Sequence, residues 1–385
     1  MSIVLSASVR QNLLSLQSTA DLLSTTQNRL ATGNKVNSAL DNPTNFFTAQ
    51  GLNNRASDIN NLLDSIGNGV QVLQAANTGI TSLQKLVDTA KSIANQVLQA
   101  PAGYTSKSTV TSTALGATAT ADDIVDGTTL ISGGVLSVTA TTGHAAFSYT
   151  LTATTSLADL NTALAASNLS ASLDSTNRLV FSSTNDTAST TIGTVAVTTG
   201  STTFAAATAP VADAASQTIR SSLVKQYNDI ITQITTTSQD ASFNGINLLN
   251  GDDLKLTFNE TGKSTLNIKG VTFNAAGLGL ASLTSGTDFL DNSSANAALV
   301  KLSSASTTLR TQASSLGSNL SVVQIRQDFN KNLINVLQTG SSNLTLADTN
   351  EEAANSQALS TRQSIAVSAL ALANQSQQSV LQLLR

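Results

Sequence analysis

The chain contains no cysteine and no tryptophan, and aromatic residues make up only 3% of its 385 residues. The lack of cysteine excludes disulfides and thiolate metal sites. The apolar residues are instead mostly Ala, Leu, Val and Ile. Side chains of this size suit closely packed helix seams better than a bulky globular core.

Charge is also scarce, because Asp, Glu, Lys and Arg make up 11% of the chain and the formal net charge is −4. No basic arm is present, so we expect no nucleic-acid partner. No apolar run approaches the length of a membrane span. The first ten residues lack a charged region followed by an apolar run, so a cleaved signal peptide is not expected.

Residues from which enzymes build their sites are few. The only histidine, His144, lies in a region rich in Ser and Thr, where we expect a surface or turn position. A Ser-His-Asp site or a histidine-containing metal site would have to use it. Asp122, Asp123 and Asp126 lie close together, but no following Glu completes a calcium loop, which favours a solvated turn. We therefore expect no catalytic residues, no cofactor, no metal and no enzymatic activity.

Composition divides the chain into three zones. Residues 2–100 and 213–385 carry apolar residues at helical spacing, and residues 104–208 are dominated by Thr, Ser, Ala and Gly. A short strand-like section, residues 243–280, interrupts the third zone. The expected fold is mainly α with a β insert, in which long antiparallel coiled-coil helices from both termini accompany a small α+β surface module.

The middle zone shows short alternating runs of the kind that form strands. These runs cover residues 136–139, 147–151 and 179–181, and residues 156–164 resemble one short helix. The pattern predicts a β-hairpin, a helix and a further strand, followed by a Thr-rich stretch that ends near residue 208.

Both helical zones repeat apolar residues in steps of four and three, which averages 3.5 residues and predicts a left-handed coiled-coil partner. The first stripe is Val9, Leu13, Leu16, Ala20, Leu23, Gln27 and Leu30, before a helix stop at Gly33-Asn34. The pattern resumes from Ile59 to Val97 after a turn at residues 41–43. In the third zone it runs without a break from Ala295 to Leu337, and a shorter helix is expected around Tyr227.

The last predicted helix starts at Asp348, whose carboxylate can cap the free amides. Its stripe is Ala366, Leu370, Ala373, Gln377, Val380 and Leu384, widened by Ile365, Leu372 and Leu383. Chain ends are usually polar and frayed, whereas these stripes are too apolar for water and too narrow to be stable alone. They must bury against another surface. An ordinary bundle is one solution, and burial between copies of the chain is the favoured one.

Three segments resemble the bacterial flagellin family. Residues 28–41 are similar to its R-L-[SA]-[ST]-G-x-[KR]-[IV]-N-[SR]-A-x-D signature. Residues 371–385 are similar to its terminal A-x-A-N-Q…V-L-x-L-L-R. Residues 243–251 are similar to the F-N-G-x-x-L-L-N-G segment that opens a β-hairpin. The resemblance covers residues 1–100 and 213–385, and the insert is the region that varies most in the family.

The resemblance implies three layers and a set of partners. Residues 1–40 with 348–385 would form an inner layer, 41–104 with 209–347 a helical layer with the hairpin, and 105–208 a surface insert. The family implies export through the flagellar secretion channel, a chaperone on the C-terminal helix, and contacts with hook-associated junction and cap proteins. The subunit would then be extracellular, in the flagellum.

One departure from the family concerns an innate immune receptor that detects many flagellins through a stretch resembling L-Q-R-[IV]-R-E-L. Here the stretch is residues 83–89, in which Val87 replaces the second Arg. A valine cannot supply the bidentate donor of an arginine. We therefore expect weak recognition by that receptor.

The sequence thus predicts a filament subunit that assembles through its terminal stripes. The residues assigned to the assembly seams are Val9, Leu13, Leu16, Leu23, Leu30, Ile365, Leu370, Leu372, Val380, Leu383 and Leu384. A hook–filament junction protein shares the terminal design, and residues 41–43 resemble that group, but the L-x-L-L-R ending favours a flagellin. A surface adhesin or glycan-binding protein that uses the insert is the alternative from another class.

Overall fold

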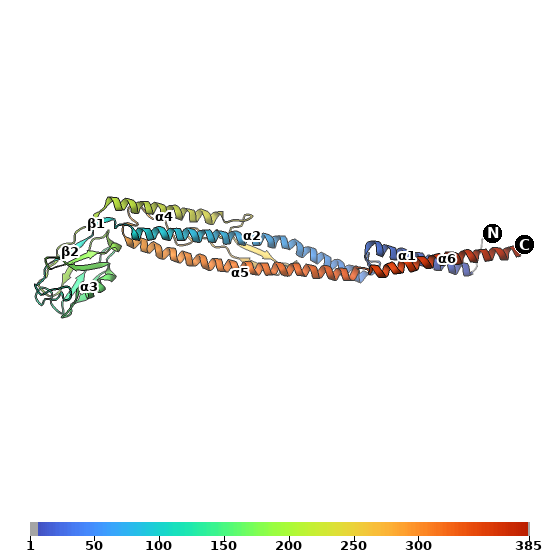
Figure 1. Ribbon diagram of the computed structural model, residues 1–385, viewed down its shortest axis with the longest axis horizontal. Helices are drawn as coiled ribbons and strands as arrows, with labels where there is room; N and C mark the ends of the chain where they lie inside the picture. Colours follow the sequence, from blue (N-terminus) through green and yellow to red (C-terminus); the bar gives the residue numbers. More distant parts are fainter. Residues whose placement is uncertain (1–6, 384–385) are drawn as a thin grey trace. The chain divides into compact units, whose positions relative to one another are not determined.

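The computed structural model describes residues 7–383, with only the backbone for residues 8, 377 and 380–383. They belong to two compact units, one of residues up to 69, 255–266 and 322 onward, the other of residues 70–254 and 267–321. Within the described range no helix is long and apolar enough to cross a membrane. The predicted fold class, mainly α with long helices from both termini and a small β-rich insert, is confirmed (Figure 1).

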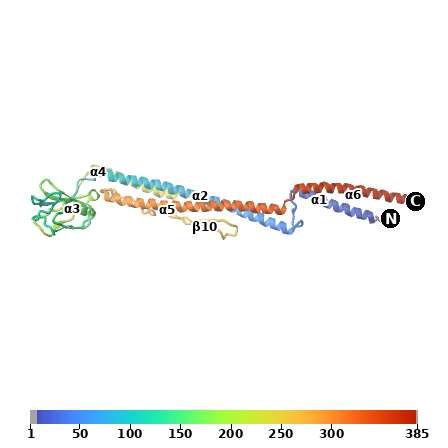
Figure 2. The same cartoon turned by 60° about the horizontal axis from the view of Figure 1, so that its bottom comes forward.

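In the first unit the terminal helices α1 (Ala7–Thr32) and α6 (Thr349–Leu383) lie side by side and run antiparallel (Figures 1 and 2). α1 stops where predicted, because Gly33 takes a φ of +70°, a conformation that ends a helix and favours glycine. Asp348 caps α6 as predicted, since its Oδ1 accepts the amide protons of Asn350 and Glu351 at 2.9 and 3.3 Å.

Two linkers pair with each other where α1 ends and α6 begins. The Lys35 N–H donates to the Thr345 carbonyl at 2.7 Å, and the Ala347 N–H donates to the Gly33 carbonyl at 3.0 Å. An ion pair between Arg29 and Glu352 adds a contact of 3.2 Å between the two helices. At this end, therefore, the terminal helices are held in register by backbone bonds.

The rest of the first unit packs the early part of α2 (Pro43–Gln99) against the late part of α5 (Asn292–Thr345). Its core consists of Ala56, Ile59, Ile334 and Leu337, with Leu52, Leu63 and Leu333 packed against it. The tip of a two-stranded hairpin, β9 (Leu254–Thr257) with β10 (Thr265–Ile268), also lies here. The buried Asn330 holds it, because its Nδ2 donates to the Phe258 carbonyl at 3.0 Å.

In the second unit α2 and α5 continue and are joined by α4 (Ala214–Asp240). The aliphatic core of these helices includes Ile80, Leu83, Val87, Leu223, Ile231, Ile234, Leu302, Leu309 and Leu316. Gly79 permits a close approach to α2, since a Cβ at this position would lie 2.7 Å from the Cβ of Ala241. The helical spacing read from the sequence therefore corresponds to a helix core.

The insert of the second unit is built on β1 (Tyr104–Ser106) and β8 (Val211–Ala212), which pair antiparallel as its neck. Beyond the neck lie two three-stranded sheets, of order β2–β6–β5 and β4–β3–β7. The remaining elements are β2 (Thr109–Ala114), β3 (Val135–Val138), β4 (Phe147–Thr150), α3 (Leu157–Leu164), η1 (Ala165–Ser167), β5 (Leu169–Leu173), β6 (Arg178–Ser183), η2 (Asn185–Thr187) and β7 (Val195–Val197). The main apolar residues between them include Leu136, Phe147, Leu160, Leu164, Leu179 and Phe181.

The predicted hairpin, helix and strand of the insert correspond to β3–β4, α3 and β6. Ser156 starts α3 with a capping box, in which its hydroxyl accepts from the Asp159 amide. β2, β5 and β7 lie in stretches where no strand was predicted. β2 is mostly Thr, Ser and Ala, so its contrast between inward and outward positions is weak, and β5 and β7 are only five and three residues long.

Candidate assembly surfaces

α1 and α6 meet along a seam with heptad spacing. On α6 the shielded positions recur in steps of four and three: Glu352, Ser356, Leu359, Gln363, Ala366, Leu370 and Ala373. On α1 the shielded positions include Val9, Asn12, Leu16, Thr19, Leu23 and Thr26. Both sets follow the coiled-coil rule, so the two helices form an intramolecular pair.

Much of this seam is polar or small. Thr19 and Thr26 occupy buried positions on α1, and the Thr19 hydroxyl is bonded to its own helix through the Ser15 carbonyl at 2.8 Å. On α6 the half-buried positions include Ser356, Gln363 and Ala366, which are also polar or small. Such a seam removes little apolar area from water, so the pairing of α1 with α6 is only weakly driven by the hydrophobic effect.

Some of the residues predicted to mediate assembly lie in the contact between α1 and α6, and others are exposed to solvent. Val9 is buried, and Leu16, Leu23 and Leu370 are half-buried. The exposed group comprises Leu13, Leu30, Ile365 and Leu372, with 38%, 40%, 63% and 69% of the residue surface exposed. Leu384 lies outside the described residues, as do the side chains of Val380 and Leu383.

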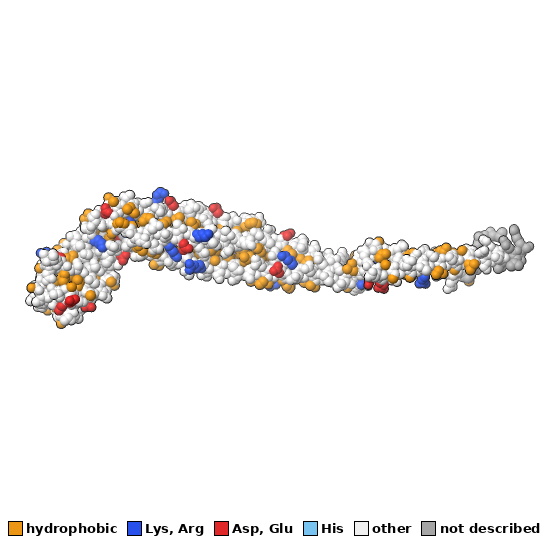
Figure 3. All heavy atoms as spheres, viewed as in Figure 1, with side chains coloured by type: hydrophobic (Ala, Val, Ile, Leu, Met, Phe, Trp, Pro, Cys, Tyr) orange, Lys and Arg blue, Asp and Glu red, His pale blue; other side chains and the backbone are white. Residues whose placement is uncertain are grey.

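Exposed apolar side chains are concentrated in the first unit. Of the 19 large apolar residues that are exposed in the described chain, 14 belong to it: Leu13, Leu14, Leu22, Leu30, Leu40, Phe47, Val322, Ile325, Phe329, Val336, Leu346, Ile365, Val367 and Leu372. Figure 3 shows apolar side chains at the surface along α1 and α6. Within the described insert, Val211 in the neck is the only large apolar residue that is exposed. Exposed apolar patches are typical of surfaces that bind another molecule, so the first unit carries the candidate assembly surfaces.

Sequence reasoning missed one of these surfaces, a row on the late part of α5 that we call the outer α5 stripe. It consists of Val322, Ile325, Phe329 and Val336, which are 45–66% exposed. Steps of three, four and seven place these residues on one face, away from the face that buries Ile334. The stripe from Ala295 to Leu337 dominates the pattern of this helix, and the signal for the outer α5 stripe is a second apolar repeat at a different phase on the same helix.

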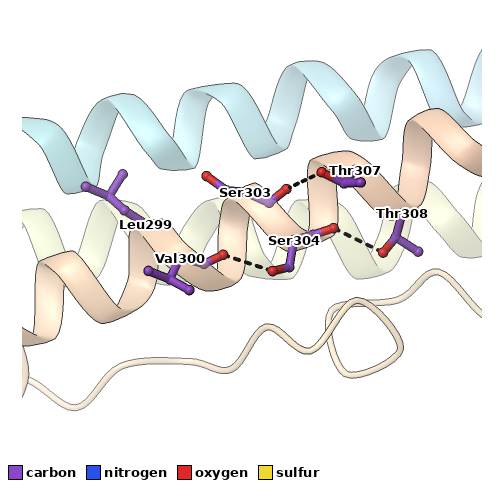
Figure 4. Close-up of a pocket in the computed structure, with 6 residues that line it drawn as sticks. All are labelled: Leu299, Val300, Ser303, Ser304, Thr307 and Thr308. Atoms are coloured by element: carbon purple, nitrogen blue, oxygen red, sulfur yellow. Dashed lines mark hydrogen bonds between the residues drawn. The ribbon is translucent and has the colours of Figure 1, made fainter.

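The second unit offers no comparable apolar surface on α5, although a shallow hollow of about 620 Å³ lies there (Figure 4). Its lining is Leu299, Val300, Ser303, Ser304, Thr307 and Thr308. The hydroxyls of Ser304, Thr307 and Thr308 donate to carbonyls of their own helix at 3.0–3.2 Å. No acid, base or activated nucleophile lines this hollow, so it does not have the chemistry of a catalytic site.

The expected surface position of His144 is wrong, because its side chain is only 2% exposed. Its Nδ1 lies 3.1 Å from the Ser167 carbonyl, and its Nε2 lies 3.0 Å from the Thr190 hydroxyl and 3.3 Å from that of Ser183. The preceding turn at residues 141–144 agrees with the sequence. Burial was missed because the covering segments, η1 and the loop after β6, come from distant parts of the insert.

Asp126 forms the turn expected around it. Its carboxylate accepts the backbone amides of Gly116, Thr128, Thr129 and Leu130. Burial alone would raise the pKa of this carboxyl, but the Thr129 hydroxyl and the amides bring it well below its usual range. Across the described residues, no group of three or more His, Asp or Glu side chains could hold a metal ion.

Comparison with known proteins identifies two matching regions. Residues 4–130 match the bacterial flagellin N-terminal helical region, and residues 299–384 match the bacterial flagellin C-terminal helical region. Together the two matches span more than half of the chain. They include α1, α6, most of α5 and the whole of α2.

Relatives with curated names agree with these matches. Flagellin FljM of Caulobacter vibrioides is 32% identical over 165 residues, which is 42% of this chain and 59% of that protein. Flagellin FljK of the same organism is 33% identical over 166 residues, again 42% and 59%. Flagellin A of Rhizobium meliloti is 37% identical over 124 residues, 32% of this chain and 27% of that protein. The chain thus spans about 59% of the length of the first two relatives.

Proposed function

The chain belongs to the bacterial flagellin family, and on this premise we propose that it is a structural subunit that polymerises into the flagellar filament of a motile bacterium. The observation that carries the proposal is the concentration of exposed apolar side chains in the first unit. A chain that stayed monomeric would leave these side chains in water, whereas assembly would cover them.

Assembly is heterologous: each copy meets its neighbours through surfaces that differ from one another, so that rotation does not close and a helical fibre grows. One surface is the exposed face of α1 and α6, which includes Leu14 and Leu372. The other is the outer α5 stripe. Covering these surfaces supplies about 25 cal/mol for each Å² of apolar area removed from water.

The layers proposed for the assembled subunit follow the resemblance to the family. Residues 1–40 with 348–385 form the inner layer, and residues 41–104 with 209–347 form the helical layer around it. Residues 105–208 project as the surface insert. The Ser- and Thr-rich exterior of the insert supports this arrangement, because an outermost module must stay solvated.

The role that we propose is structural and not enzymatic. Flagellins are structural proteins, and the buried His144 is bonded to a carbonyl and two hydroxyls and not to a carboxylate. The hydroxyls that line the hollow on α5 are likewise bonded to their own helix. Both observations are consistent with a chain selected for packing.

The partners proposed beyond other copies of the chain come from the same family premise. They are hook-associated junction and cap proteins, and an export chaperone on the C-terminal helix, with the subunit exported through the flagellar secretion channel. Ile365 and Leu372 support the chaperone, because more than half of each side chain is exposed on α6 and would otherwise promote aggregation.

Weak recognition by the innate immune receptor also belongs to the proposal. Val87 is fully buried on the core face of α2, whereas Lys85 two positions earlier is exposed. A buried valine can neither donate a hydrogen bond nor reach a receptor. Purified monomer should therefore activate receptor-bearing reporter cells poorly, and strong activation would contradict this part of the proposal.

The central experiment is filament growth from short seeds, followed by sedimentation and electron microscopy. The unaltered chain should form long helical filaments. Ile365→Ser combined with Leu372→Ser should reduce polymer strongly, because both side chains are exposed in the single chain and their loss leaves the α1–α6 seam intact. Val211→Ser in the neck of the insert, where the side chain is 55% exposed, is the matched control and should leave growth unchanged.

Two outcomes would contradict the proposal. Equal growth of the double variant and the control would mean that the α6 surface does not mediate assembly. Short rings that never elongate, formed by the unaltered chain, would support a hook–filament junction protein instead. As a separate test of the seam, Leu16→Asp should abolish filaments while circular dichroism shows the central helices still folded.

A further inference from the structure

The insert is connected to the helices of the second unit by a short neck. β1 and β8 pair through Tyr104 with Ala212 and Ser106 with Val211, and the register shifts between these two pairs. The Asp213 amide adds a bond to the Gly103 carbonyl at 2.9 Å. A two-stranded ribbon of this length has little bending resistance of its own, because isolated two-stranded pairs are only marginally stable.

A second contact joins the insert to the start of α5. The Ser189 hydroxyl donates to Oδ2 of Asp291 at 2.5 Å, and Nδ2 of Asn296 donates to Oδ1 of Asp186 at 3.3 Å. Ser189 and Asp186 belong to the loop around η2, far along the chain from the neck strands. Each of the two bonds pairs one carboxylate with one neutral donor, so the contact is polar and specific in direction.

The helix side of this contact is fixed independently of the insert. Oδ1 of Asp291 accepts the Ser293 amide at 3.2 Å, which caps the first turn of α5. Just before it, the Phe289 carbonyl accepts from Nη1 of the buried Arg220 at 3.0 Å. Arg220 also attracts Asp291 through its charge. The carboxylate that receives Ser189 is therefore positioned by groups of the helical part.

The insert side is fixed as well, and here the single histidine has a role. His144 contacts the hydroxyls of Ser183 and Thr190, which lie on either side of the η2 loop. The Thr187 hydroxyl donates to the Asn168 carbonyl at 3.3 Å and anchors the same loop to the segment before β5. The loop is thus held against the body of the insert before it meets α5.

We propose that the η2 loop is a clasp: Ser189 on Asp291 and Asp186 on Asn296 fix the orientation of the insert on the helices, which the neck alone does not do. The inference goes beyond the filament role, because it concerns contacts within one chain. With both the neck and the clasp in place, the insert has one preferred orientation on the helices of the second unit. With the neck alone, many orientations are open to it.

Distance measurements between two spin labels test the clasp. The chain has no cysteine, so Ala153→Cys in the insert and Ser303→Cys on α5, both exposed, give two unique labelling sites in the full-length chain. The monomer should give one narrow distance distribution. Ser189→Ala with Asn296→Ala should broaden it at least twofold, while Ser189→Thr, which keeps a hydroxyl, should remain narrow.

The control is Ser172→Ala, which removes an exposed hydroxyl from β5 that takes no part in the two bonds of the clasp. It should leave the distribution narrow, and circular dichroism of all variants should match that of the parent chain. A distribution for the double variant as narrow as that of the control would overturn the proposal. A broad distribution in the parent chain would overturn it too, since the clasp would then not fix the orientation.

Discussion

Replacing Arg220 with Met should destabilise the second unit more than any comparable change at an exposed arginine. The side chain is 2% exposed and lies where α2 ends and α5 begins. Its Nε donates to the Pro101 carbonyl at 2.9 Å, and its two terminal nitrogens donate to Phe289, Ala100 and Asn292 at 3.0–3.3 Å. Met preserves the apolar stem and removes every donor.

The magnitude follows from the acceptors left behind. A buried carbonyl without a partner costs about 1–3 kcal/mol. The bond to the Phe289 carbonyl is buried, and the bonds to the Ala100 and Pro101 carbonyls are part-buried and cost less to lose. Relief from burying the guanidinium, whose pKa is lowered by burial despite the nearby Asp291, offsets part of this cost. We expect a net loss of about 3 kcal/mol, which in a unit of this size lowers the melting temperature by about 6–12 °C.

The assay is thermal unfolding followed by circular dichroism and calorimetry. Arg310→Met on α5 is the control, because the Arg310 side chain is exposed and makes no hydrogen bond or ion pair with the described residues. It should change stability by less than about 0.5 kcal/mol. If Arg220→Met lowered the melting temperature no more than Arg310→Met, the reasoning about the buried carbonyls would be refuted.

Three further predictions concern pH and capping. Burial raises the pKa of Tyr227 to about 12, above the unfolded value of about 10. The free energy of unfolding should therefore fall as pH rises through this interval, and Tyr227→Phe should lose that dependence in alkaline denaturation. The pKa of Asp126 is lowered in the folded chain, so its contribution to the free energy of unfolding is present above the unfolded pKa of about 4 and is lost as pH falls. The stability of Asp126→Asn should therefore fall less on acidification than that of the parent chain, and an equal fall would contradict this prediction. Asp348→Ala should cost about 1 kcal/mol and speed hydrogen exchange at the amides of Asn350 and Glu351, whereas unchanged exchange would mean that the cap is unimportant.

Local signals mark several boundaries of the long helices. Gly33 ends α1, and Pro43 occupies the first position of α2 after Asn42, whose Oδ1 accepts the Asn45 amide at 3.0 Å. Asp348 caps α6 as its carboxylate suggests. Each of these signals acts within four residues, so it can be recognised without knowing what the helix packs against.

The face that each helix turns toward its partner was harder to predict. Leu13 and Leu30 fit a heptad as well as Thr19 and Thr26 do, and apolarity favours the leucines. The structure nevertheless buries the threonines between α1 and α6 and exposes the leucines. A periodic pattern gives the spacing of a stripe but not which of two adjacent stripes meets a given partner, because this depends on residues more than 300 positions away.

The same uncertainty explains the other omissions. The outer α5 stripe lies beside a stronger pattern on one helix, and its function depends on neighbours outside the chain. His144 is buried by loops that are distant in sequence, and no local rule reports such covering.

The paired linkers between the terminal helices impose an order on folding. Arg29 and Glu352 are 323 positions apart, and the backbone bonds beside them join segments separated by nearly the same distance. Closing a loop of that length costs conformational entropy that no nearby contact offsets until the intervening helices have packed. We therefore expect the pairing of α1 with α6 to form late in folding, because its contacts are the ones with the largest separation along the chain.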